Sequence, residues 1–312
     1  MLKRTLFFAS AVYLSTRHEQ LVITYPDVKA VPKARRLKEE APPREKTVPI
    51  EDIGVIVLEH PQITVTNQLM ARLMEYKVAV IHCNGSHMPA AMLWPLRGHS
   101  QQSERFRHQI NASVPLKKNL WKQTVQAKIR NQAALLEANG QDAERMWQWA
   151  REVKSGDRLN HEAQAALYYW PRIFPEIPDF IRHPEGEPPN NLLNYGYAVL
   201  RAIAARALVA SGLLPTLGFF HRNKYNAFCL ADDVMEPYRP YVDRMVAEVL
   251  RSGMPYEHLT PKLKTWLAAL PALDVTINGR QSPLLIAMSR TTNALYECYA
   301  GVRKHILYPE LR

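Results

Sequence analysis

The chain has 312 residues, and its 40 Lys and Arg against 29 Asp and Glu give a formal net charge of +11. A chain of this length folds as one large or two ordinary domains and needs no disulfide or metal to support its core. Hydrophobic residues make up 47% and charged residues 22%, which excludes wholesale disorder. The low glycine content and the lack of a fixed repeat exclude collagen-like, solenoid and propeller folds. We therefore expect a basic, soluble, two-domain protein.

The chain contains three cysteines, Cys83, Cys229 and Cys298. Their odd number and the lack of a Cys-x-x-Cys pair argue against a disulfide framework or a structural zinc site, and favour buried thiols in a reducing cytoplasm. The apolar run at residues 5–14 is short and is followed by β-favouring residues, so it does not predict a secretory signal. The most apolar long stretch, residues 198–220, contains two arginines, so we expect no membrane span.

The first 85 residues predict a small β-rich domain. Runs that favour strands lie at residues 6–8, 11–14, 21–23, 53–58, 63–65 and 78–82. Residues 67–76 have apolar side chains at helical spacing, with Asn67 as the expected N-cap. Residues 28–48 are rich in Lys, Arg, Glu and Pro, and we interpret them as either a long exposed hairpin tip or a basic arm.

The rest of the chain predicts a linker and then helices. Residues 86–105 hold Gly and Pro without periodicity, which is typical of a linker. Helical spacing follows at residues 106–139, 142–154, 161–170, 193–210, 234–251, 261–269 and 283–306, with a Pro-rich interruption at 171–189. The sequence therefore predicts an α+β protein, in which a β-rich domain (residues 1–85) is joined by a linker (86–105) to an all-α domain (106–312).

Two segments place an acidic residue or a histidine beside a break in the backbone pattern. Residues 156–162 open a helix and put Glu162 in its first turn, where the helix dipole favours an anion. In residues 218–226, GFFHRNKYN, His221 lies at a chain reversal beside two cations. A dipole-compensating glutamate and an ordinary structural histidine are alternatives that the local sequence leaves open.

A third segment, residues 231–243, contains Asp233 and Glu236. Asp233 as an N-cap with Glu236 three residues later is a capping-box pattern, which is the alternative to a functional site. Taken together, two carboxylates and an imidazole from separate helix starts suit Mg²⁺ or Mn²⁺ better than structural zinc. Such an ion stabilises the charged transition state of phosphodiester exchange, and basic surroundings would hold a polyanion.

The same residues carry a resemblance to a known family. The runs LNYGYAVLRA (residues 193–202), GFFHRNKYN (218–226) and DVMEPYRP (233–240) resemble the universal CRISPR-associated endonuclease and integrase of spacer acquisition. Supporting similarities lie at residues 49–53, 120–122, 128–132 and 155–157. The similarity covers nearly the whole chain in order, and it is greatest to the type II branch of the family.

The resemblance implies an N-terminal β domain, which contributes to dimerisation, and a C-terminal all-α catalytic domain with a Mg²⁺ or Mn²⁺ site. Carried over by motif, the metal-binding and catalytic residues are Glu162, His221 and Glu236. Asp233 matches an acidic position one turn earlier that supports the site without binding the metal. No nucleotide cofactor is implied, and the sequence has no Gly-x-x-x-x-Gly-Lys phosphate loop.

The resemblance also implies an activity and partners. The activity is attack of the 3′-hydroxyls of short double-stranded DNA, the protospacer, on the phosphodiesters of a CRISPR repeat, which serves antiviral defence. The family acts as a homodimer that joins a second small CRISPR adaptation protein in a heterohexamer. The predicted nucleic-acid-binding residues are Lys117, Lys118, Arg201, Arg222, Lys224 and Arg239. The alternative is a basic scaffold that binds nucleic acid without catalysis; a zinc hydrolase is disfavoured because no His-Glu-x-x-His motif occurs.

Overall fold

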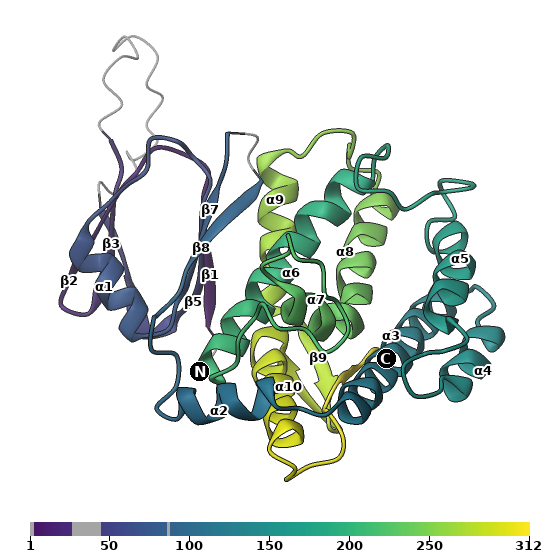
Figure 1. Cartoon of the computed structure of the whole chain (residues 1–312). Coiled ribbons are helices and arrows are strands. Elements are labelled where there is room, and N and C mark those ends of the chain that lie inside the picture. Colours follow the sequence, from purple (N-terminus) through teal and green to yellow (C-terminus); the bar gives the residue numbers. More distant parts are fainter. Residues whose placement is uncertain (1–2, 27–44, 86–87) are drawn as a thin grey trace. The chain divides into compact units, whose positions relative to one another are not determined.

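The computed structural model describes residues 3–26, 45–85 and 88–312, and the chain divides into two compact units, Met1–Pro95 and Leu96–Arg312 (Figure 1). The order of a β-rich unit before a helical unit confirms the predicted fold class. The division between the two units, after Pro95, lies within the predicted linker at residues 86–105. Strand β8 (Pro89–Leu93) lies inside the predicted linker and pairs with β7 (Ala79–Cys83), so it belongs to the first unit.

The described residues of the N-terminal unit form two four-stranded sheets. One has the order β1-β5-β7-β8, where β1 is Arg4–Phe8 and β5 is Ile53–Leu58; its first three strands are parallel and β8 is antiparallel. The other has the order β4-β3-β2-β6 and comprises β2 (Tyr13–Arg17), β3 (Gln20–Thr24), β4 (Glu45–Pro49) and β6 (Thr64–Val65). Of the predicted segment 28–48, residues 28–44 lie outside the described residues, and the remainder lies in β4.

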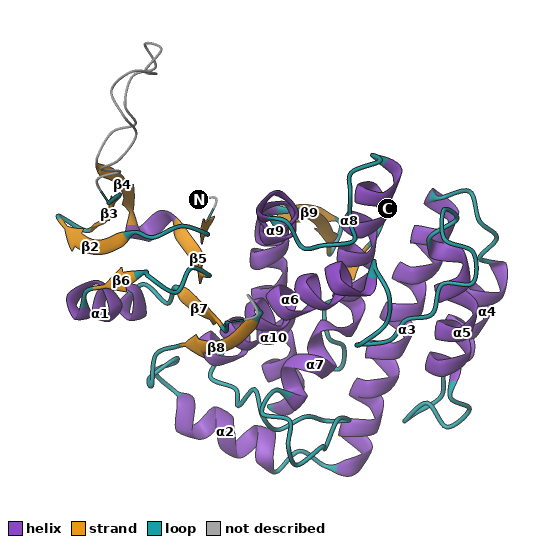
Figure 2. Ribbon diagram, turned by 90° about the horizontal axis from the view of Figure 1, so that it is seen from above, coloured by secondary structure: helices purple, strands orange, loops and turns teal. Residues whose placement is uncertain are grey.

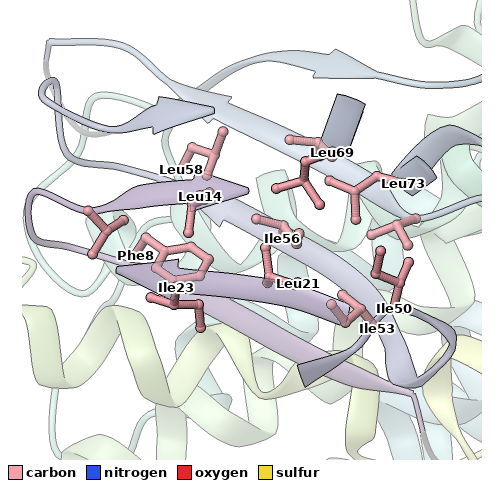
Figure 3. Close-up of a cluster of buried hydrophobic side chains, with 13 residues drawn as sticks. Phe8, Leu14, Leu21, Ile23, Ile50, Ile53, Ile56, Leu58, Leu69 and Leu73 are labelled. Carbon is pink, nitrogen blue, oxygen red and sulfur yellow. The ribbon is translucent and has the colours of Figure 1, made fainter. Parts of the chain in front are cut away.

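Apolar side chains from both sheets and from helix α1 (Asn67–Glu75) form the core of this unit (Figure 3). Strand β5 is buried along its whole length, as expected for a β-branched run covered on both faces. Leu21 of β3 and Leu69 of α1 are fully buried in the same cluster. The predicted N-cap of α1 was one residue too late, because the hydroxyl of Thr66 accepts the backbone N–H of Leu69.

The C-terminal unit is built around two long helices, α3 (Val114–Ala138) and α6 (Asn190–Ala210). Helices α4 (Glu144–Glu152) and α5 (His161–Ile173) lie beside α3 (Figures 1 and 2). Around α6 lie α7 (Cys229–Met235), α8 (Arg239–Arg251), α9 (Pro261–Ala268) and α10 (Leu284–Tyr299). By length and composition α6 could cross a membrane, but 72% of its apolar window is buried inside the protein, as in an ordinary core helix.

Three details of this unit differ from the sequence-based prediction. The single helix predicted for residues 106–139 is two helices, α2 (Gln102–Ile110) and α3, because Ser113 caps α3 and Pro115 occupies its first turn. The last predicted helix ends at Tyr299. A small antiparallel sheet of β9 (Asp274–Ile277), β10 (Arg280–Pro283) and β11 (Pro309–Glu310) was missed, so the unit is mostly rather than entirely helical.

Candidate active site

Glu162 lies in the first turn of α5, as predicted. The carboxylate of Asp157 accepts the backbone N–H of His161 at 2.9 Å and that of Glu162 at 3.0 Å, so it satisfies two of the donors that a helix start leaves unpaired. Asp157 and Asn160 both have positive φ, which turns the chain sharply into the helix. The side chain of Glu162 is 24% exposed and extends toward α3.

Lys128 of α3 connects Glu162 to Glu236. Its Nζ lies 2.7 Å from Oε1 of Glu162 and 2.6 Å from Oε2 of Glu236. Burial by itself would lower the pKa of Lys128, but the two carboxylates outweigh it, Glu236 more than Glu162, and the pKa is raised above its usual value. The lysine is therefore an ammonium ion held between two carboxylates.

Glu236 occupies the short 3-10 helix η3 (Glu236–Tyr238), between α7 and α8. Oε1 of Glu236 accepts a hydrogen bond from Nε of Arg239 at 2.9 Å. Burial would raise the pKa of Glu236, but Arg239 and Lys128 overcome this effect and lower it to about 2. The capping-box interpretation is wrong, because Asp233 lies within α7 and no side chain caps that helix. The glutamate is buried and charged.

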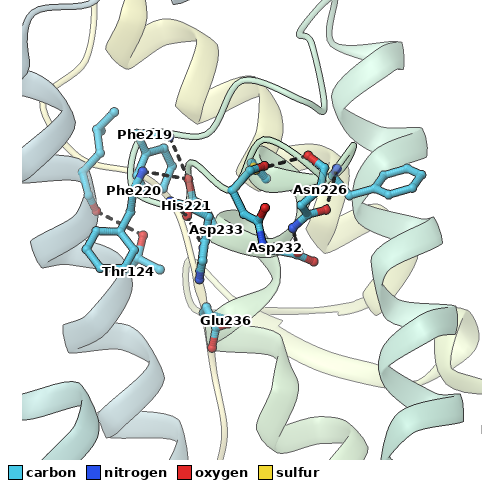
Figure 4. A network of polar contacts seen from close by, with 12 residues as sticks. Thr124, Phe219, Phe220, His221, Asn226, Asp232, Asp233 and Glu236 are labelled. Atoms are coloured by element: carbon cyan, nitrogen blue, oxygen red, sulfur yellow. Dashed lines mark hydrogen bonds and ion pairs between the residues drawn. The ribbon is translucent and has the colours of Figure 1, made fainter. Parts of the chain in front are cut away.

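Asp233 organises the loop that carries His221 (Figure 4). Its Oδ2 accepts the backbone N–H groups of Phe219 and Phe220 at 2.7 and 3.0 Å, and its Oδ1 accepts that of His221 at 3.1 Å. Oδ1 also lies 2.6 Å from Nδ1 of the His221 ring. This hydrogen bond raises the pKa of His221 and, in the neutral ring, places the proton on Nδ1 and the lone pair on Nε2.

Packing supports the same loop from two sides. The ring of Phe220 stacks on Trp121 of α3, with centroids 3.7 Å apart, and the His221 ring meets Trp121 edge-on at 5.8 Å. Gly218 is needed for close approach, because a Cβ there would lie 2.5 Å from the carbonyl oxygen of His221 and 2.7 Å from Oδ2 of Asp233. The loop is thus held by α3 and α7 together.

The predicted nucleic-acid-binding residues fall into two groups. Arg239 and Arg201 are engaged within the unit: Arg239 pairs with Glu236 and stacks on Tyr197, and Arg201 forms two hydrogen bonds with Asp232. The other four predicted residues lie at the surface: Lys117, Lys118, Arg222 and Lys224. The ammonium of Lys224 lies 4.8 Å from the ring centre of the exposed Tyr225.

Lys128, Trp121 and Asp157 are site residues that the sequence analysis marked only as parts of segments resembling the family, at residues 128–132, 120–122 and 155–157. Lys128 had a visible signal. It follows Trp121 by seven residues and Thr124 by four, so it continues the buried face of α3, where a cation requires a buried partner. The identity of that partner depends on α5 and η3, which are remote in sequence.

The residues present fit a divalent cation. Oxygens of Glu162 and Glu236 already share one cation, and the buried Oε2 of Glu236 makes no hydrogen bond besides its ion pair, so it keeps acceptor capacity. His221 adds a nitrogen that Asp233 orients. Two carboxylates and an imidazole suit Mg²⁺ or Mn²⁺. Within residues 3–26, 45–85 and 88–312, no group of three or more His, Cys, Asp or Glu side chains is placed so that it could hold a metal ion as it stands, and Lys128 contacts both carboxylates.

Solved structures share this fold. A casposase bound to its integration product superposes with a TM-score of 0.78 at 21% identity, covering 98% of this chain and 92% of the casposase. A Cas1 protein from Thermotoga maritima superposes with a TM-score of 0.72 at 14% identity, covering 97% of this chain and 99% of that one. At these identities the likeness establishes the fold.

Sequence establishes the family. The family model described as CRISPR associated protein Cas1 matches residues 7–264, and the chain belongs to this family. It is 37% identical over 271 residues to the CRISPR-associated endonuclease Cas1 of Neisseria meningitidis, covering 85% of this chain and 87% of that protein. The family expected from the motifs is confirmed.

Proposed function

We propose that the protein is a metal-dependent DNA endonuclease and integrase that inserts short duplex DNA into a CRISPR array as part of antiviral defence. The observation that carries this proposal is the convergence of Glu162 and Glu236 on one cation, beside a histidine oriented by Asp233. The Cas1 family, the Neisseria relative named as an endonuclease and the fold shared with a casposase bound to its integration product support it.

Glu162, Glu236 and Nε2 of His221 would hold Mg²⁺ or Mn²⁺, which would supply positive charge to the phosphate and to the attacking or leaving oxygen. Asp233 keeps the histidine in the tautomer whose Nε2 carries a lone pair. Arg239 and Trp121 hold Glu236 and the histidine loop in place, so little reorganisation is needed during the reaction. One phosphodiester forms for each one broken, so no nucleotide cofactor is required.

Charge and family support the partners that we propose. The net charge of +11 and the surface cations Lys117, Lys118, Arg222 and Lys224 suit the phosphates of protospacer and repeat DNA. Two target phosphates require two sites at a fixed separation, which a homodimer provides, with the β-rich unit in the contact. A solved Cas6-RT-Cas1–Cas2 complex contains this fold, which supports a small Cas2-type protein as partner in a heterohexamer. We place the protein in the cytoplasm, where such DNA is available.

A strand-transfer assay with a labelled duplex and a repeat-containing target tests the proposal. Glu162→Gln, His221→Ala and Glu236→Gln should each reduce joining in Mn²⁺ about 100-fold or more, and duplex affinity should be retained. Their effects should not add, because one missing ligand already disables the site. Glu248→Gln, at an exposed glutamate of α8, is the matched control.

The alternative of a non-catalytic nucleic-acid-binding scaffold makes a different prediction for the same variants. If Glu162 and Glu236 serve only as structural partners of Lys128 and Arg239, each substitution should lower stability, by up to about 3–5 kcal/mol for the buried Glu236, and leave any joining unchanged. Near-normal joining by Glu236→Gln would therefore refute the metal-dependent integrase.

A further inference from the structure

The ammonium of Lys128 contacts both glutamates at once. Its distances to Oε1 of Glu162 and Oε2 of Glu236 are 2.7 and 2.6 Å, and its side chain is only 13% exposed. The two carboxylate oxygens are therefore no farther apart than the sum of these distances. A buried carboxylate left without a counter-charge is costly, so this lysine stabilises both glutamates.

The formal charges of the cluster balance without a metal. Lys128 and Arg239 are the cations that contact Glu162 and Glu236, which gives two positive and two negative charges. The two cations differ in what holds them. Arg239 also stacks on the ring of Tyr197, whereas the contacts of Lys128 are to the two glutamates, through a flexible four-carbon stem. Lys128 is the cation that can leave.

A divalent ion bound by both Glu162 and Glu236 would lie close to the two carboxylates, in the region that the ammonium of Lys128 occupies. An ammonium and a metal ion cannot share that space, because the ammonium already contacts each carboxylate at hydrogen-bond distance. This also accounts for the finding that, among the residues that the structure describes, no group of three or more acidic, histidine or cysteine side chains could hold a metal ion as it stands.

We propose that Lys128 is a built-in occupant of the metal position, which holds Glu162 and Glu236 together in the metal-free protein and is displaced when a divalent cation binds. The proposal rests on the function proposed above. Displacement lowers the apparent affinity for the metal by the fraction of molecules in which the position is vacant. Removing the lysine should therefore tighten metal binding.

Binding of Mn²⁺ to the full chain without DNA, followed by electron paramagnetic resonance, tests this. Lys128→Met removes the competing charge and keeps most of the side-chain volume, and it should bind Mn²⁺ at least about tenfold more tightly than the wild type. Lys262→Met, at an exposed lysine of α9, removes the same charge elsewhere and should leave the affinity within about twofold. Equal or weaker binding by Lys128→Met would overturn the proposal.

Thermal unfolding gives a second readout. Lys128→Met should unfold at a lower temperature than the wild type in a chelator, because two glutamates lose their shared counter-charge. Its gain in melting temperature on addition of Mn²⁺ should exceed that of the wild type. If Lys128→Met does not fold, Lys128→Gln keeps a hydrogen-bond donor without the charge and should show the same tighter binding. A smaller Mn²⁺-induced gain than in the wild type would overturn the exchange.

Glu236→Gln separates failure of the exchange from failure of the proposed function. Loss of Mn²⁺ binding in Glu236→Gln, with no gain in Lys128→Met, would refute the exchange and leave the metal site in place. Wild-type Mn²⁺ binding by Glu236→Gln would instead show that the metal is not held here, and both proposals would fail.

Discussion

Oδ1 of Asp233 and Nδ1 of His221 lie 2.6 Å apart, and the same carboxylate accepts three backbone N–H groups from residues 219–221. One fully buried side chain therefore sets both the path of the loop and the orientation of the imidazole. A carboxylate that hydrogen-bonds to a metal-binding histidine is worth about 10- to 100-fold in metal affinity or activity.

The first prediction concerns this pair. Asp233→Asn keeps the size of the side chain but can present an N–H₂ group to Nδ1, which favours the wrong tautomer of His221. We expect about a 10- to 100-fold loss of joining and of Mn²⁺ affinity. Asp232→Asn, one position earlier, removes a carboxylate that pairs with Arg201 and should leave Mn²⁺ affinity nearly unchanged. Equal behaviour of the two variants would contradict the prediction.

The second prediction concerns the backbone at Gly218. A Cβ at this position meets the carbonyl oxygen of His221 and the carboxylate of Asp233, so Gly218→Ala must displace the loop. Such overpacking costs about 1–3 kcal/mol, and joining should fall with it. Gly85→Ala is the control, since no atom of the described residues lies within 4 Å of its added Cβ. Melting temperature and strand transfer are the measurements, and wild-type values for Gly218→Ala would be evidence against a rigid loop.

The third prediction is a pH dependence of stability that arises from Asp243. This buried carboxylate accepts hydrogen bonds from Tyr169 at 2.8 Å and Tyr197 at 2.5 Å. Burial is the larger effect and raises the pKa of Asp243 from 3.8 to about 6. The folded state thus binds this proton more tightly than the unfolded state, so the contribution to stability is complete below the unfolded pKa and is lost as pH rises through about 6.

As pH rises from about 5 to about 8, the loss of this contribution should lower the free energy of unfolding by about 1 kcal/mol. Denaturant unfolding at both pH values measures it. Asp243→Asn cannot titrate at this position, so the free energy of unfolding of this variant should fall less over the same pH interval, by about that amount. The same pH dependence in the variant and the wild type would show that Asp243 does not titrate in this range.

The fourth prediction concerns DNA binding by Lys117 and Lys118, at the start of α3. Each lysine that contacts a phosphate contributes about 0.9 to the slope of log affinity against log salt. The double variant Lys117→Ala and Lys118→Ala should therefore bind a short duplex more weakly, with a slope shallower by up to about 2, and Mn²⁺ binding should be unchanged. An unaltered slope over a salt series would place the DNA elsewhere on the protein.

Local sequence was sufficient for much of the fold because many elements are specified by nearby residues. The buried run of β5, the first turn of α5 with Glu162 and the long apolar α6 all lie where their patterns indicate. Errors arose where one pattern covered two elements. The break between α2 and α3 is marked only by Ser113 and Pro115. Strand β8 was missed for another reason, because it is defined by its pairing with β7.

For the site, the sequence by itself determined which residue types are available and, through its motifs, the family. What only the tertiary structure decided is which charges meet. Glu162, Lys128 and Glu236 come from α5, α3 and η3, and no local pattern states that one ammonium lies between two glutamates. The interaction energy of two charges falls as the distance between them grows, so which charges pair depends on how the helices pack. Packing alone places the ammonium of Lys128 between Glu162 and Glu236.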